Sequence, residues 1–266
     1  MSSPSLSPGA VKHRVVMGRR IAALAGVCAA ALLLTGSAAE AAVGSTLDLR
    51  FDWPTSGAVT TARPPVAGGS AAGGVKVSVV SAGGGGLQSV RSRSGHGWAV
   101  GFSSRGNGIV AVTPTTAQLS PETATFAFSA DVLPSGDWSQ GSNVLQRGLA
   151  DDRGQYKLQL DGGRPSCSIK GTAGTLTVYA SRSVTAGVWH RIACMRVGST
   201  VTLSVVRLTD AQSFSYSKTG ATGSVATAST TTPLSIGGKL TPKGSLATWQ
   251  PDQFRGAIDN VLVTIG

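Results

Sequence analysis

The sequence predicts an all-β fold, a sandwich or barrel of antiparallel strands. From Thr46 onward, no segment of any length has the apolar periodicity of a helix. Instead, about fourteen short runs with alternating or β-branched residues recur between Gly, Ser, Thr and Asp. Short strands at this close spacing are typical of a sandwich or a barrel.

Each predicted strand is a short apolar-alternating or β-branched run with turn residues on both sides. In TFAFSADV, Phe126 and Phe128 fall on one face and Ser129 and Asp131 on the other, which predicts one core face. The dipeptide Gly198-Ser199 stands between two such runs and predicts a hairpin. In chain order, the predicted strands are residues 46–53, 75–80, 98–102, 109–113, 123–133, 143–148, 156–161, 166–169, 175–181, 188–197, 200–208, 213–217, 233–238 and 256–265.

The N-terminus has the pattern of a secretory signal peptide. Residues 1–20 are basic, residues 21–34 are uncharged and apolar, and Ala39-Glu40-Ala41 offers a cleavage site. The apolar run is too short to span a bilayer comfortably, so we expect removal of residues 1–41, secretion of residues 42–266 and no stable membrane insertion afterwards. Arg19-Arg20 leaves a twin-arginine signal open, and Cys28 leaves a lipoprotein open, although Val27 before it fits a lipidation site poorly.

The chain is basic, with a formal net charge of +11 at pH 7. A positive surface attracts acidic glycans, teichoic-type polymers or nucleic acid. Basic residues concentrate in residues 89–98, but this run lacks the interleaved aromatic residues of a single-strand nucleic-acid groove. We therefore expect no nucleic-acid partner, and the oligomeric state stays open.

Two cysteines remain after the expected cleavage, Cys167 and Cys194. In an exported protein two cysteines usually pair, so we expect a disulfide. His190 stands four residues before Cys194, but along a strand this spacing separates the two by about 13 Å. A reactive Cys–His pair is therefore not expected.

The order of elements in the C-terminal part resembles the laminin G-like members of the concanavalin A-like lectin/glucanase superfamily. The resemblance rests on TATFAFSADV, NVLQRG…GQYKLQL, GVWHRIACMRVGSTVTLSV, PLSIGG and FRGAIDNVLVTI, from Thr123 to Gly266. It implies a jelly-roll sandwich of two antiparallel sheets, and the cysteine pair is similar to that of some secreted bacterial members. Residues 54–122 are longer and richer in glycine than the family's pattern, so their placement stays open. Residues 64–74, 83–86 and 219–233 are expected to be flexible because of their composition.

Catalytic groups are not evident in the sequence. Glycoside hydrolases of this superfamily carry an E-x-D-x-x-E strand, but the expected mature chain keeps only Glu122 as a glutamate. Asp151 and Asp152 are adjacent in a predicted turn, and adjacent strand residues point to opposite faces. The motifs of serine hydrolases, zinc proteases, P-loop proteins and dinucleotide-binding proteins are absent from the sequence. We therefore expect a protein that is not an enzyme.

Asp259 and Asp52 are the candidate metal ligands. The resemblance implies that an aspartate in the closing strand, here Asp259, helps to hold Ca²⁺ or fastens the first and last strands together. Asp52 lies in the resembling opening strand and is its natural partner if the termini lie side by side. Calcium needs six to eight oxygen ligands, which carbonyls and water can complete. The alternative is that Asp259 only hydrogen-bonds a neighbouring loop.

Trp138 and Trp249 are the candidate ligand-binding residues, because both stand in polar, turn-rich surroundings. A sugar site needs an exposed aromatic platform with polar groups around it, although a tryptophan in a loop often serves as an anchor instead. Arg153 is a candidate for contact with an acidic ligand. The sequence therefore predicts a secreted, non-catalytic recognition module that binds carbohydrate or a cell-surface polymer. A structural or adhesive protein-binding module and a glycan-active enzyme remain alternatives.

Overall fold

The computed structural model describes residues 46–95, 97–138 and 141–266. These residues belong to one compact unit, Gly36–Gly266, and they fold into two antiparallel β-sheets. Within the described ranges the single helix is a 3₁₀ turn, η1 (Ala72–Gly74), and no helix there is long and apolar enough to cross a membrane. The expected signal peptide, residues 1–41, lies outside the described residues.

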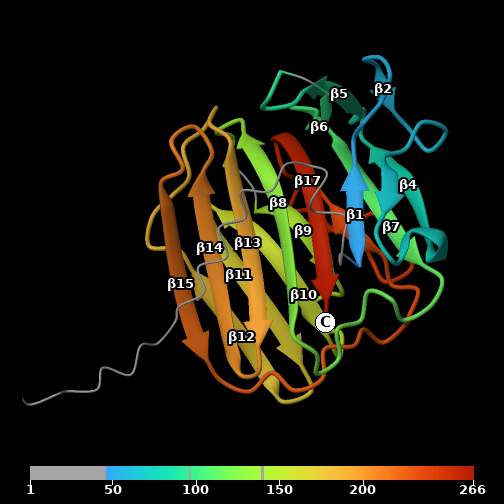
Figure 1. Ribbon diagram of the computed structural model, residues 1–266. Coiled ribbons are helices and arrows are strands. Elements are labelled where there is room, and N and C mark those ends of the chain that lie inside the picture. Colours follow the sequence, from blue (N-terminus) through green and yellow to red (C-terminus); the bar gives the residue numbers. More distant parts are fainter. Residues whose placement is uncertain (1–45, 96, 139–140) are drawn as a thin grey trace, which may run out of the picture. The chain divides into compact units, whose positions relative to one another are not determined.

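The larger sheet has ten strands and contains the last strand of the chain near its middle. Its order is β15-β14-β13-β8-β17-β6-β5-β2, and β1 pairs with both β17 and β3. Figure 1 shows β15, β14, β13, β8 and β17 side by side in this sheet. The bounds are β1 Leu47–Arg50, β2 Ala58–Val59, β3 Val66–Gly68, β5 Leu87–Arg91, β6 Trp98–Phe102, β8 Phe126–Pro134, β13 His190–Val197, β14 Thr200–Arg207, β15 Ser213–Thr219 and β17 Gly256–Ile265.

The smaller sheet has seven strands in the order β12-β11-β10-β9-β16-β7-β4. Since β8 belongs to the larger sheet and β9 to the smaller one, the chain passes between the sheets several times, as a jelly roll requires. The bounds are β4 Val75–Ala82, β7 Asn107–Pro114, β9 Ser142–Arg147, β10 Gln155–Asp161, β11 Arg164–Gly171, β12 Gly174–Tyr179 and β16 Leu234–Ile236.

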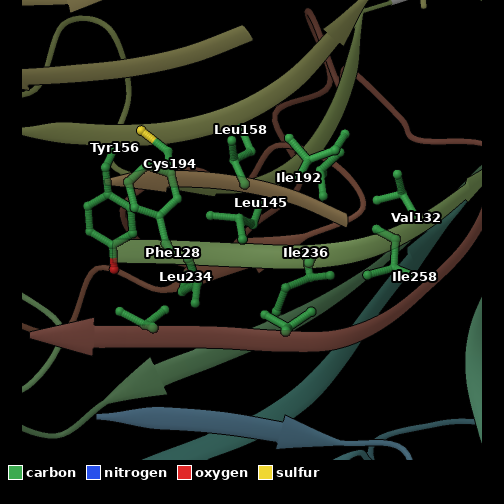
Figure 2. Close-up of a cluster of buried hydrophobic side chains, with 14 of the residues drawn as sticks. Phe128, Val132, Leu145, Tyr156, Leu158, Ile192, Cys194, Leu234, Ile236 and Ile258 are labelled. Atoms are coloured by element: carbon green, nitrogen blue, oxygen red, sulfur yellow. The ribbon is translucent and has the colours of Figure 1, made fainter. Parts of the chain in front are cut away.

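The core lies between the two sheets. Phe126 and Phe128 of β8 contact Tyr156 of β10, with ring centroids 5.6 and 5.0 Å apart. Figure 2 shows Phe128, Tyr156 and aliphatic side chains from both sheets gathered in this layer. Cys167 of β11 and Cys194 of β13 form a disulfide that joins the sheets through the core, with Cα atoms 5.9 Å apart. The predicted disulfide is confirmed.

The all-β jelly-roll prediction is confirmed. Every predicted strand overlaps an observed one, and the hairpin predicted at Gly198-Ser199 joins β13 to β14, where Val197 pairs with Thr200. The structure adds the short strands β2, β3 and β5, which the sequence analysis did not predict. Residues 54–122 supply strands to both sheets, from β2 to β7.

Consecutive antiparallel strands place the loops alternately at two ends of the sandwich. One end, called end A, carries the β8–β9 and β10–β11 connections, the β12–β13 loop (180–189), the β14–β15 loop (208–212) and the β16–β17 loop (237–255). The opposite end, called end B, carries the β9–β10 loop (148–154) and the β15–β16 loop (220–233). These names are used below.

Two buried arginines hydrogen-bond to backbone carbonyls at end B. The Arg147 guanidinium donates hydrogen bonds to the carbonyls of Leu119, Thr230 and Thr232 at 2.9–3.0 Å. The Arg196 guanidinium donates to the carbonyls of Glu122, Ala124 and Gly223 at 2.6–3.1 Å, and it lies over the ring of Phe126. Burial lowers the pKa of both arginines. Residues 219–233, expected to be flexible from their composition, thus supply backbone carbonyls that bind guanidinium groups inside the protein.

Candidate functional site

The outer face of the seven-stranded sheet is polar along β9 and β10. Along β10 the side chains alternate, so that Tyr156, Leu158 and Leu160 enter the core while Lys157 and Gln159 face outward. Asp161 shares this outward face, where its Oδ2 accepts a hydrogen bond from Ser166 Oγ at 2.8 Å and its Oδ1 accepts one from the Gln159 amide. The face therefore presents amino, amide and carboxylate groups in one row.

The neighbouring strand β9 continues the polar face with two amides. Asn143 Nδ2 donates to Gln146 Oε1 at 2.6 Å, and Gln146 Nε2 donates to the carbonyl of Gly148 at 2.7 Å. Within the described part of the chain, Asn143 Oδ1 and Gln159 Oε1 are buried and accept no hydrogen bond. A buried amide oxygen without a donor is uncommon in a folded protein, and each one could accept a hydrogen bond from a water molecule or a ligand.

The β16–β17 loop covers one side of this face. Its Leu240 and Leu246 pack on outward residues of the sheet, Ile109 and Ala111 of β7 and Val80 of β4. These apolar contacts hold the loop on β4 and β7, next to the polar row of β9 and β10.

An ion pair joins two residues of the same loop, and a backbone hydrogen bond ties the loop to β9. Lys239 Nζ and Asp252 Oδ2 lie 2.7 Å apart and are mostly buried, and the Asn143 amide donates to the Asp252 carbonyl at 2.9 Å. Burial lowers the pKa of Lys157; the carboxylate of Asp252 acts in the opposite direction and the ammonium of Lys239 in the same direction. The charge of Lys157 on β10 therefore interacts with the charges of Asp252 and Lys239 in the loop.

The two predicted ligand-binding tryptophans both lie at end A, but in different environments. Trp249 belongs to the β16–β17 loop and is 68% exposed, the highest value for a large hydrophobic side chain among the described residues. Trp138 is partly buried, packs against the core and lies against Gly163 of the β10–β11 turn. Trp249 is thus an open aromatic surface, whereas Trp138 has the contacts of a loop anchor.

The third predicted ligand-binding residue lies elsewhere. Arg153 belongs to the β9–β10 loop and is exposed at end B. Because β10 runs the length of the sandwich between this loop and end A, Arg153 cannot join Trp249 around one sugar unit. Lys157, Gln159 and Asp161 were not among the predicted site residues, although their alternation with core residues in YKLQLD was a visible signal for an outward polar row.

The predicted metal ligands lie on the other sheet. Asp259 of β17 pairs in register with Asp131 of β8, and Asp52 follows β1, which pairs with β17. Burial raises the pKa of Asp259 to about 7; the hydrogen bond from the Asn260 amide opposes this shift, and the carboxylates of Asp131 and Asp52 add to it.

Asp131 is already occupied by protein donors. Arg191 Nε and Nη2 bind its two oxygens at 2.7 and 2.9 Å, and Asn260 Nδ2 donates to Oδ2 at 2.8 Å. Within the described ranges, three or more His, Cys, Asp or Glu side chains do not gather anywhere as a metal-binding group. Asp52 and Asp259 would therefore supply two carboxylates to a calcium ion, whose other oxygens must come from carbonyls and water.

His190 and Cys194, four residues apart in the sequence, have separate environments. His190 Nδ1 donates to the Val188 carbonyl at 2.8 Å, since that carbonyl can only accept, and Cys194 belongs to the disulfide. A cysteine–histidine reactive pair is therefore excluded, in agreement with the spacing argument.

The C-terminal part of the chain is similar to the laminin G domain. Residues 143–264 match the family model of the laminin G domain, which covers the chain from β9 to β17. The resemblance to laminin G-like domains, expected from Thr123 to Gly266, is confirmed over these residues. Comparison with the curated proteins finds no significant match.

Solved structures share the fold at low sequence identity. The binding domain of botulinum neurotoxin DC in complex with SialylT has a TM-score of 0.53 and 8% identity, over 84% of this chain and 48% of that chain. The binding domain of Paraclostridial Mosquitocidal Protein 1 has a TM-score of 0.51 and 13% identity, over 71% and 44%. Domain 4 of AbnA, a GH43 extracellular arabinanase from Geobacillus stearothermophilus solved with arabinotriose, has a TM-score of 0.50 and 16% identity, over 72% and 82%. This chain thus spans less than half of both toxin binding domains and most of the arabinanase domain.

Proposed function

We propose that this protein is an exported, non-catalytic recognition module that binds a carbohydrate or a cell-surface polymer. The observation that carries the proposal is Trp249, an indole left 68% exposed on the β16–β17 loop. The same loop packs on the outer face of the seven-stranded sheet through Leu240 and Leu246. An indole combines a large apolar surface with a polar N–H group, and tryptophan is enriched at binding interfaces for this reason. The laminin G match and the shared fold with toxin binding domains fit a carbohydrate- or protein-binding module.

The chemistry of the face suits a saccharide. An indole ring offers an apolar surface for the C–H groups of a sugar ring, while amides, carboxylates and amines bind its hydroxyl groups. Lys157, Gln159 and Asp161 supply these polar groups, and the ion pair of Lys239 and Asp252 fixes the loop that carries Trp249. Two structures with this fold, the neurotoxin domain and the arabinanase domain, were solved with SialylT and arabinotriose respectively.

The carboxyl groups of this face favour binding over cleavage. Hydrolysis of a glycosidic bond needs one protonated and one ionised carboxyl group on either side of it. Asp252 is paired with Lys239, and Asp161 accepts hydrogen bonds from Ser166 and Gln159. Both carboxylates therefore have structural partners within the protein.

A protein-binding role is the second candidate, and it has its own surface. On the ten-stranded sheet, Val197 and Met195 of β13 are exposed, Val197 by 51%. They lie on the outer face of that sheet, away from Trp249. Exposed apolar side chains on a sheet face suit contact with another protein.

Binding of the purified protein to an array of plant, algal, host and bacterial polysaccharides tests the proposal. We expect selective retention on one class of polysaccharide, which falls at least about tenfold in Trp249→Ala and stays unchanged in Val197→Ala. Uniform failure by a folded protein, or retention that Trp249→Ala leaves intact, contradicts the proposed site. The appearance of new reducing ends in the bound polysaccharide would show an enzyme instead.

Export is a separate part of the proposal. It rests on the basic, apolar and small-residue order of residues 1–41. The mass of the protein recovered from the culture medium should correspond to a chain that begins at Ala42. Recovery of the intact chain from the cells alone would contradict export.

A further inference from the structure

A second site lies at a corner of the sandwich at end A. It is a pocket of about 210 Å³ between the inner faces of β13, β14 and β15 and the β12–β13 loop. Pockets for drug-sized ligands have volumes of about 300–1,000 Å³, so this pocket suits a ligand with a single ring. Its lining comes from strands of the larger sheet and from the β12–β13 loop, and none of the polar groups around Trp249 belongs to it.

His190 gives the pocket a hydrogen-bond acceptor. The side chain is 4% exposed, and its Nδ1 donates to the Val188 carbonyl. Burial lowers the pKa of His190 below its ordinary value of 6.5, although the hydrogen bond to Val188 and the Asp210 carboxylate oppose this shift, so the neutral form of the ring predominates at pH 7. In a neutral ring with the proton on Nδ1, Nε2 carries a lone pair and can accept a hydrogen bond from a ligand hydroxyl.

The two arginines of the pocket differ in their partners. Arg207 binds the carboxylate of Asp210, with Nε 2.9 Å from Oδ1, and this pair is neutral overall. Arg182 of the β12–β13 loop lies over the ring of Phe214 at 4.4 Å from the centroid. In the part of the chain that the structure describes, no carboxylate forms an ion pair with Arg182. The pocket therefore has one uncompensated positive charge, held in place by an aromatic ring.

Apolar and hydroxyl groups complete the lining. Val205 and Val184 are buried, and Tyr216 is half-buried with its hydroxyl 3.3 Å from Ser181 Oγ. A ligand in this pocket thus meets a cation on one side, a neutral imidazole within, and apolar side chains around its ring. This combination of groups matches a small ring that carries hydroxyl groups and one negative charge.

We propose that this pocket binds a single acidic sugar unit, whose carboxylate pairs with Arg182 and one of whose hydroxyl groups donates to His190 Nε2. The guanidinium supplies a planar set of donors for a carboxylate, which is its preferred partner. The site is independent of Trp249, and it binds the monosaccharide itself.

Titration of the purified protein with glucuronate, glucose and acetate, followed by NMR chemical shifts, tests this proposal. We expect glucuronate to bind at least about ten times more tightly than either glucose or acetate, because it alone combines the ring with the charge. Arg182→Gln should reduce glucuronate binding to the level of glucose. Because the Arg182 side chain is exposed, we expect the variant to fold as the wild type does. Arg105→Gln, the same charge change at an exposed arginine outside the pocket lining, should leave binding unchanged.

The outcomes separate this site from the proposed polysaccharide site. Trp249→Ala should leave glucuronate binding intact even where it abolishes retention on polysaccharide. Equal binding of glucuronate and acetate would overturn the sugar part of the inference. Failure to bind glucuronate, or equal loss of binding in Arg182→Gln and Arg105→Gln, would overturn the inference as a whole.

Discussion

Removal of the Cys167–Cys194 disulfide should destabilise the protein by about 3.6 kcal/mol. The two cysteines are 27 residues apart in sequence and join the two sheets. In the chain-entropy model, a loop of this length loses about 12 cal/mol/K in the unfolded state, which is about 3.6 kcal/mol at 25 °C. For a domain of this size, each 1 kcal/mol shifts Tm by about 2–4 °C, so Tm should fall by about 7–14 °C.

Two comparisons isolate the cross-link from packing. Both sulfur atoms are fully buried, so replacement of both cysteines by alanine also leaves a small cavity and adds about 1 kcal/mol. Wild-type protein unfolded in urea with a reductant keeps both sulfur atoms and loses only the cross-link. Urea unfolding followed by circular dichroism should give a loss of about 3–4 kcal/mol for the reduced protein and more for the double variant. A loss below about 1 kcal/mol in both would refute the entropic argument.

The remaining predictions concern buried groups and calcium. Arg147→Met should cost at least about 3 kcal/mol in urea unfolding, because several buried carbonyls lose a charged donor together; a loss under 1 kcal/mol would contradict this role. The pKa of Asp259 is raised to about 7, so its protonated form favours the folded state. This contribution is fully present below the ordinary pKa of 3.8 and is lost as the pH rises through 7. Wild-type stability should therefore fall between pH 4 and pH 8 by more than that of Asp259→Asn, and equal pH profiles would contradict the shift. If Asp52 and Asp259 hold calcium, millimolar Ca²⁺ should raise Tm in the wild type and not in Asp52→Asn, whereas an equal rise in both would exclude Asp52 as a ligand. Gly237→Ala should destabilise by at least about 2 kcal/mol, because φ is +85° and an added Cβ would collide with the Phe102 ring; unchanged Tm would contradict this packing.

Alternation and β-branching predicted the long strands because both patterns are local. The three unpredicted strands lack them: β2 has two residues, β3 lies in the glycine-rich stretch 64–74, and β5 follows the run Gly83–Gly86. Each is defined by its partner strand, as Ala58 and Val59 are by their pairing with Gln88 and Leu87. Such pairing depends on contacts distant in sequence, which no short window contains.

The order of residues 219–233 also depends on distant contacts. Its composition of Gly, Ala, Ser and Thr is typical of a flexible segment, yet its carbonyls bind Arg147 and Arg196 of two core strands. In the sequence these arginines look like ordinary polar residues of a strand. Only the fold shows that they are buried and that the loop supplies their acceptors.

The candidate site was predictable in part. The polar surroundings of Trp249 indicated exposure, and the structure agrees. The same pattern at Trp138 did not show that Gly163 leaves room for its ring, because a glycine in a different turn decides this. Arg153 carries the same positive charge as the arginines at end A. It lies at end B, because successive loops lie at opposite ends of the sandwich. Composition therefore identified residue types, and topology decided which of them meet.

The most direct test of the account follows the indole N–H signals of the five tryptophans by NMR while a fragment of the retained polysaccharide is added. The signal of Trp249 is assigned as the one missing in Trp249→Phe. The account predicts that this signal shifts most, while those of the core residues Trp53 and Trp189 stay in place. Shifts confined to other tryptophans, or a bound fragment that leaves the Trp249 signal unmoved, would contradict the proposed binding face.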